Sequence, residues 1–203
     1  MRSLEKISFP PIKKTAELHP NIINMLFENK KEILRKLSDL RALHFIDHIS
    51  ITVINEFKKI AVFSITPSVE FNLIVHGLWK FDNSFFPETS EDNTFFWWEE
   101  GYEISLFGIL KEMKEAQHNF TLGLSLVRKY EKTKIVYSFA TRSQNANLKD
   151  YYFDNINELF KIGDYGYKLI ENIYHNYAFI KSPFKINSSI NKPNLRLITN
   201  KFL

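Results

Sequence analysis

One acidic side chain in a strongly apolar stretch constrains the fold of this chain most. Residues 59–98 read KIAVFSITPSVEFNLIVHGLWKFDNSFFPETSEDNTFFWW, and Asp82 stands there among large apolar side chains. A carboxylate buried in such surroundings is costly unless hydrogen bonds reach it. We therefore expect Asp82 either to cap backbone N–H groups of its own turn, where Asn83 and Ser84 follow, or to receive a hydrogen bond from another donor. A small-molecule pocket is one source of such a donor.

The hydrophobic pattern predicts an α+β domain. Alternation of apolar and polar residues predicts strands at 49–55, 59–65, 120–128 and 134–141, with one more between 93 and 107. Helical spacing covers 21–37, as one long helix or two short ones, and also 67–77, 104–116 and 148–178, the last in two pieces that meet at Gly163 and Asp164. This order favours an α/β/α sandwich, in which helices cover both faces of a central five-stranded antiparallel sheet.

Length and composition fit one domain with flanking segments. The chain has 203 residues, of which 44% are hydrophobic and 15% aromatic, so it can bury a core. We expect the domain to span 17–180, between an extended arm at 1–16 and a tail at 181–203. The sequence has no cysteine, which excludes disulfides, thiolate catalysis and cysteine-ligated metal.

Charge and hydropathy limit the partners and the location of the chain. Its 27 basic and 23 acidic residues give a net charge of +4, and the basic residues are scattered, which indicates a solvated surface more than a nucleic-acid site. No apolar run approaches the roughly 20 residues of a membrane span, and the N-terminus lacks the apolar region of a signal peptide. A cytoplasmic protein without a membrane partner is expected.

The order of features around Asp82 resembles the autoinducer-binding domain of LuxR-type quorum-sensing transcriptional regulators. A strand ending at Pro67, a short helix, Gly77, Asp82 and a later Trp follow one another as in that family. Gly123 in HNFTLGLSLVRK, the segment IVYSFATRS and the C-terminal helical region extend the resemblance over residues 21–177. It implies a PAS-like fold that binds a small amphipathic ligand such as an acyl-homoserine lactone, without a cofactor and without catalysis.

The resemblance also implies which residues bind the ligand. The Asp that matches Asp82 accepts a hydrogen bond from the ligand amide in the family. Trp97 and Trp98 match the pocket Trp, with Trp97 at the better spacing, although the run FFWW also suits an ordinary core. Ser138 and Thr141 match a strand that offers a hydroxyl, and hydroxyls are also common on half-exposed sheet faces.

The short helix departs from the family pattern. The family has there a Trp and a Tyr that donate hydrogen bonds to the ligand, whereas Phe71 and Leu73, near the matching positions, cannot donate from their side chains. Trp79 or Trp97 could supply one indole N–H instead. We therefore predict weak or absent binding of simple acyl-homoserine lactones and a preference for an acyl amide or a hydroxylated, lipid-like signal.

Other functions receive less support from the sequence. The pattern His44-x-x-Asp47-His48 straddles a helix-to-strand junction, so its side chains need not converge on a metal, and no metal is predicted. No helix-turn-helix is recognised in the tail, so the chain is expected not to read DNA. The favoured function is a LuxR-type ligand sensor that lacks its DNA-binding half and forms a homodimer or heterodimer. The alternatives are a sensor-only protein that regulates a full-length partner by heterodimerisation, or a small α/β enzyme acting on an acyl substrate.

Overall fold

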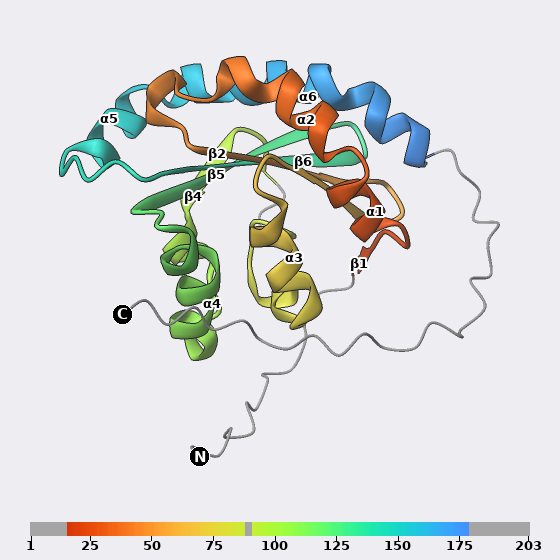
Figure 1. Ribbon diagram of the computed structural model, residues 1–203, viewed down its shortest axis with the longest axis horizontal. Coiled ribbons are helices and arrows are strands. Elements are labelled where there is room, and N and C mark those ends of the chain that lie inside the picture. Colours follow the sequence, from red (N-terminus) through yellow and green to blue (C-terminus); the bar gives the residue numbers. More distant parts are fainter. Residues whose placement is uncertain (1–15, 88–90, 179–203) are drawn as a thin grey trace.

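A mixed sheet lies between two layers of helices (Figure 1). The computed structural model describes residues 16–87 and 91–178. The predicted tail at 181–203, and all but the last residue of the predicted arm at 1–16, therefore lie outside the described residues. Helices α2, α5 and α6 cover one face of the sheet, and α1, α3 and α4 lie on the other. The strands are β1 (Glu17–Leu18), β2 (His48–Ile54), β3 (Lys59–Ser64), β4 (Thr94–Trp97), β5 (Leu122–Tyr130) and β6 (Thr133–Thr141).

The sheet has the strand order β1-β3-β2-β6-β5-β4. All neighbours are antiparallel except β1, which pairs parallel to β3. The predicted five-stranded antiparallel sheet is therefore correct for β2 to β6, and the sixth strand makes the sheet mixed. With only two residues, β1 is too short for an alternating pattern to reveal it.

The helices agree with the predicted segments except at one break. The segment 21–37 forms two short helices, one of the two predicted alternatives, which are separated at the polar Glu28 and Asn29. The break predicted at Gly163 and Asp164 was wrong, because the chain breaks at Asn155 and runs helical through Gly163. The α-helices are α1 (Ile22–Phe27), α2 (Lys30–Leu37), α3 (Pro67–Val75), α4 (Phe107–Lys114), α5 (Leu148–Asp154) and α6 (Ile156–Ala178).

The two faces of the sheet differ in chemistry. Successive side chains of a strand point to opposite faces. In β2, Ile49, Ile51 and Val53 point into an apolar core beneath α2, α5 and α6. The alternate residues His48, Ser50 and Thr52 point the other way, and they are also buried. One layer of the protein is therefore an ordinary apolar core, and the layer beneath α1, α3 and α4 contains buried polar groups.

Candidate functional site

Four serines form a row across the polar face of the sheet. The strand register places Ser50 of β2 beside Ser64 of β3 and Ser138 of β6, and Ser138 beside Ser125 of β5. All four are buried, and the hydroxyl oxygens of Ser125 and Ser138 are 2.8 Å apart in a hydrogen bond. We call these residues the serine row. Buried hydroxyls on four adjacent strands give this layer a polar floor.

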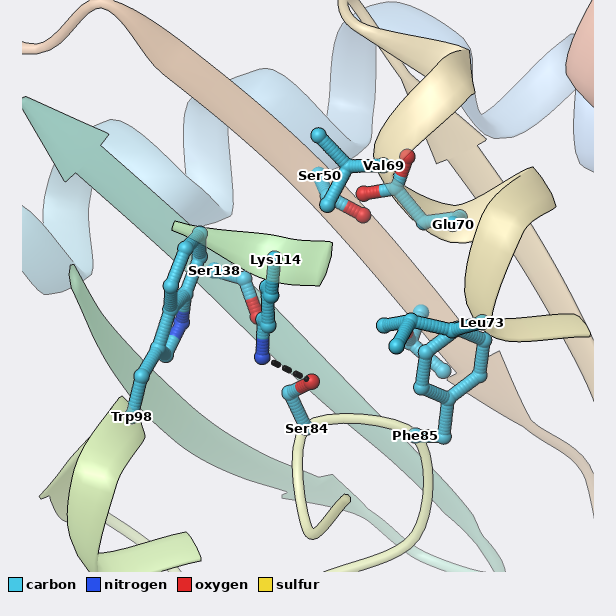
Figure 2. Close-up of a pocket in the computed structure, with 10 residues that line it drawn as sticks. Ser50, Val69, Glu70, Leu73, Ser84, Phe85, Trp98, Lys114 and Ser138 are labelled. Carbon is cyan, nitrogen blue, oxygen red and sulfur yellow. Dashed lines mark hydrogen bonds between the residues drawn. The ribbon is translucent and has the colours of Figure 1, made fainter. Parts of the chain in front are cut away.

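Helices α3 and α4 and the loop after α3 cover the serine row and leave a small cavity. The cavity has a volume of about 10 Å³. A space of that size holds about one water molecule. Figure 2 shows Lys114 between the Trp98 ring and Ser84, with Glu70 and Ser50 toward the other end. The residues around the cavity are Ser50, Thr52, Val69, Glu70, Leu73, Ser84, Phe85, Trp98, Lys114 and Ser138.

Asp82 receives its hydrogen bonds from within the protein. Lys114 Nζ lies 2.7 Å from Asp82 Oδ2, and the Ser84 backbone N–H and hydroxyl both donate to Asp82 Oδ1. Lys114 also donates to Ser84 Oγ at 2.7 Å, and its Nζ lies 4.0 Å from the centroid of the Trp98 ring, in a cation–π contact. The Asp82 carboxylate therefore caps a backbone N–H of its own turn, and it also receives a hydrogen bond from Lys114, which is distant in the sequence.

Lys114 was not among the site residues predicted from the sequence, although its position on the helix could have indicated it. Lys114 follows Leu110 by four residues, so it lies on the same face of α4 as that fully buried residue. A Lys on the apolar face of a helix needs a partner, and Asp82 is a carboxylate that also needs one.

Burial shifts the pKa values of the groups around this ion pair. Burial lowers the pKa of Lys114, although the nearby negative charges of Asp82 and Glu115 act to raise it. Burial raises the pKa of Glu115. The Tyr102 hydroxyl donates to Glu115 Oε1 at 2.7 Å, and this hydrogen bond acts to lower the same pKa. Burial, with the charge of Asp82, raises the pKa of Tyr102. These groups form one buried polar cluster beside the cavity.

Glu70 and His48 form a second buried pair, and the His48 ring also packs 5.9 Å from the Trp98 ring. His48 Nε2 lies 3.3 Å from Glu70 Oε1, within ion-pair distance, but the geometry falls short of a hydrogen bond. Burial raises the pKa of Glu70, but the interactions with His48, together with smaller ones from Ser64 and the backbone, outweigh it, and the net shift is downward. Several buried polar atoms here have no hydrogen-bond partner among the described residues. They are Glu70 Oε2, both ring nitrogens of His48, and Trp98 Nε1. Such atoms are rare in folded proteins and indicate a missing polar contact.

The structure brings together some of the residues predicted from the sequence. Trp98, Leu73 and Ser138 line the cavity, and Asp82 lies next to it through Lys114 and Ser84. Ser138 is buried in the serine row, whereas the alternative interpretation placed it on a half-exposed sheet face.

Four other predicted residues lie elsewhere. Trp97 packs against the apolar core on the opposite face of the sheet, and Thr141 also points there, because it is three residues from Ser138 on one strand. Phe71 contacts Phe27 edge-to-face at 5.3 Å, and Trp79 packs 6.5 Å from the Phe85 ring, outside the set that lines the cavity.

Gly123 explains how Trp98 fits against the sheet. A Cβ atom at Gly123 would lie 2.2 Å from Trp98 Cδ2. The indole ring therefore lies directly on the backbone of β5, where only glycine leaves room. The Gly and the Trp of the sequence resemblance meet at this point.

The residues of the His44-x-x-Asp47-His48 pattern do not converge. His44 Nδ1 is 2.9 Å from the Tyr151 hydroxyl, and Asp47 accepts a hydrogen bond from the Arg142 backbone N–H. His48 points into the polar layer toward Glu70. Within residues 16–87 and 91–178, no group of three or more His, Asp or Glu side chains could hold a metal ion.

Comparisons with known proteins find similarity at the level of structure. No family model matches the sequence, and no curated protein matches it. The fold resembles that of SdiA. A crystal structure of Escherichia coli SdiA is 16% identical, with a TM-score of 0.49, and the match covers 80% of this chain and 66% of the SdiA chain. A structure of SdiA in complex with octanoyl-rac-glycerol is 14% identical, with a TM-score of 0.47, and the match covers 72% of this chain and 59% of that chain.

This likeness concerns the fold. The chain spans less than two thirds of the length of both SdiA chains. Among the described helices, none is long and apolar enough to cross a membrane.

Proposed function

We propose that this chain is the signal-sensing domain of a LuxR-type regulator, and that it binds a small amphipathic molecule between the sheet and helices α3 and α4. The observation that carries this proposal is the set of unpartnered polar atoms around the cavity. Trp98 is 1% exposed and Glu70 5% exposed, yet Trp98 Nε1 and Glu70 Oε2 have no hydrogen-bond partner among the described residues. Each such group costs about 1–3 kcal/mol, which a ligand that pairs with it would recover.

Ligand binding requires the cavity to expand. A volume of about 10 Å³ is far below that of a lipid-like molecule, so α3 and α4 have to move away from the sheet. These helices have nine and eight residues, and helices of that length depend on packing for their stability. A ligand that fills the space under them stabilises the folded state through linkage between binding and folding.

The side chains of α3 disfavour simple acyl-homoserine lactones. Val69 and Leu73 line the cavity and neither donates a hydrogen bond. Asp82 already accepts three hydrogen bonds from Lys114 and Ser84, out of about four that a carboxylate can accept, and it is not among the residues that line the cavity. The ligand proposed here is therefore held by Trp98 and Glu70 in place of Asp82.

We propose binding without chemical conversion of the ligand. A serine nucleophile needs a base within hydrogen-bond distance. His48 is the imidazole next to the serine row, and neither of its ring nitrogens has a hydrogen-bond partner among the described residues. Dimerisation, a cytoplasmic location and the absence of DNA binding by this chain stay predictions, which sedimentation, fractionation and DNA-binding measurements can test.

Thermal unfolding with a panel of ligands tests the proposal. The panel contains octanoyl-rac-glycerol, N-octanoyl homoserine lactone, methyl octanoate and octanoate. At least one is expected to raise the Tm of the protein, and Trp98→Phe, which removes the indole N–H, is expected to reduce that rise. The matched control is Trp97→Phe on the opposite face, where the rise should persist. Equal responses of both variants, or no response of the unmodified protein to any compound, contradict the proposal.

A further inference from the structure

We infer that the site selects an uncharged, hydroxyl-rich head group, which lies on the serine row and donates a hydrogen bond to Glu70. This inference rests on the proposed function and concerns the class of ligand. It assigns a recognition role to Glu70 and to Ser50, which neither the sequence resemblance nor the ion pair at Asp82 includes.

The groups that face the cavity need both donors and acceptors from a ligand. Glu70 Oε2 is an acceptor without a donor, and Trp98 Nε1 is a donor without an acceptor. The hydroxyls of Ser50, Thr52 and Ser138 line the same space and can act in either way. A hydroxyl group also donates and accepts, so a head group with neighbouring hydroxyls can donate to Glu70 Oε2 and accept from Trp98 Nε1. The carbonyl of an ester or an amide can accept a hydrogen bond from Trp98. An ester without hydroxyls, however, leaves Glu70 without a donor.

The charges around the cavity disfavour an anionic head group. The buried carboxylate of Glu70 lines the cavity, and a second carboxylate beside it would be repelled in a medium of low polarity. Lys114 does not compensate for this, because it already donates to Asp82 and Ser84 and contacts the Trp98 ring. A free fatty acid therefore meets a like charge and finds the ammonium group engaged.

The apolar lining fixes where the body of the ligand lies. Val69 and Leu73 of α3 and Phe85 of the following loop line the side of the cavity that α3 covers. These side chains belong to the layer that has to move when the cavity expands. An acyl chain between them and the sheet would keep its head group on the serine row.

Three probes with the same acyl chain separate these effects in the unmodified protein. Octanoyl-rac-glycerol has hydroxyl donors, methyl octanoate has the ester carbonyl alone, and octanoate has a negative charge. Calorimetric titration is expected to show octanoyl-rac-glycerol binding about tenfold tighter than methyl octanoate, and octanoate binding more weakly than both. The three share one chain length, so differences in affinity report the head group.

A charge-neutral variant tests the role of Glu70. In Glu70→Gln, the ratio of the Kd of octanoate to the Kd of octanoyl-rac-glycerol is expected to fall about tenfold, because the like charge is gone. The matched control is Glu112→Gln on the exposed side of α4, where the ratio should not change. Ser50→Ala, a smaller change on the floor of the site, should weaken octanoyl-rac-glycerol more than methyl octanoate.

The outcomes distinguish this inference from the proposed function. Binding of octanoate or of the lactone with equal or higher affinity than octanoyl-rac-glycerol overturns the inference and leaves the sensor proposal standing. An octanoate disadvantage that is the same in Glu70→Gln and in the unmodified protein also overturns it. If no compound of the panel binds, both the sensor proposal and this inference are wrong. The ranking on the unmodified protein decides the matter even if Glu70→Gln does not fold.

Discussion

At the scale of single residues, the Lys114–Asp82 pair dominates the polar layer. Both side chains are almost fully buried, with exposed fractions of 3% and 0%. Removing one partner of a buried pair leaves an uncompensated charge, whereas removing both can be nearly neutral. The pair is therefore sensitive to single substitutions and tolerant of paired ones.

We predict that Lys114→Met lowers the free energy of unfolding by about 3–5 kcal/mol, because it leaves the Asp82 carboxylate without its ammonium partner. The double variant Lys114→Met with Asp82→Asn should lose less than the sum of the two single variants. Urea unfolding of the four proteins in a double-mutant cycle measures this coupling.

The matched control for this prediction is Lys111→Met on the same helix. Lys111 pairs with Glu99 at the surface, with 46% of its side chain exposed, so its loss should change stability by less than about 1 kcal/mol. A loss for Lys114→Met as small as that of the control would show that the buried pair contributes little.

At the scale of secondary-structure elements, helix α6 lies very close to strand β6. A Cβ atom at Gly163 would come within 2.1 Å of Tyr137 Cδ2. The glycine therefore marks a close contact between helix and strand, and the helix continues through it. The sequence favoured a break there because glycine is a poor helix former.

We predict that Gly163→Ala lowers the free energy of unfolding by about 1–3 kcal/mol, because the added methyl group forces Tyr137 and α6 apart. Gly108→Ala in α4 is the control, since no atom lies within 4 Å of a Cβ there. It should gain up to about 1 kcal/mol from helix propensity. Chemical unfolding of both variants measures the difference, and a stabilising Gly163→Ala would refute the close contact.

Asp164 connects α6 to strands β5 and β6. It accepts two hydrogen bonds from the Arg128 guanidinium, at 3.1 and 2.9 Å, and one from the Tyr137 hydroxyl at 2.8 Å. Burial acts to raise the pKa of Asp164, but these hydrogen bonds outweigh it, and the pKa lies below its usual value of 3.8.

A lowered pKa predicts how stability depends on pH. The contribution of Asp164 is complete above the unfolded pKa of 3.8 and is lost as the pH falls below it, through the folded pKa. The difference in unfolding free energy between the unmodified protein and Asp164→Asn should therefore be constant from about pH 5 to 7 and shrink below pH 4. Urea unfolding across this range measures it. The exposed Asp154→Asn is the control, and a difference that grows as the pH falls would contradict the assignment.

At the scale of the whole molecule, the two helical layers have different structures. Helix α6 has 23 residues and packs on a continuous apolar core, whereas α3 and α4 are short and cover buried polar groups. Regions with short helices and imperfectly paired polar groups open more readily than a continuous core. The layer that contains α6 is therefore expected to be rigid, and the layer that contains α3 and α4 is expected to open to a ligand.

Hydrogen exchange can detect this asymmetry. Amides of α3 and α4 should exchange faster than those of β2 and β6, which occupy the centre of the sheet. Octanoyl-rac-glycerol should slow exchange in α3, α4 and residues 78–86 and leave α6 unchanged. Mass spectrometry of digested protein with and without the compound measures this, and protection confined to α6 would place the ligand on the wrong side of the sheet.

Much of the fold follows from local patterns in the sequence. Strands β2 to β6 and the main helical segments were predicted because alternation and helical spacing are local properties that burial imposes on each element. The need of Asp82 for hydrogen-bond donors was also clear from its apolar neighbours. The two-residue β1 and the break at Asn155 were missed, because neither leaves a periodic signal.

The composition of the site depended on the tertiary structure. The sequence favoured Trp97, but the direction in which each strand faces puts Trp98 in the polar layer and sends Trp97 and Thr141 to the opposite core. Lys114 reaches Asp82 across 32 residues, and the serine row exists only through the register of four strands. The need of a buried carboxylate for a partner could be predicted from its neighbours along the chain. Only the packing of α4 on the sheet decided which partner it has, because long-range pairing has no local pattern.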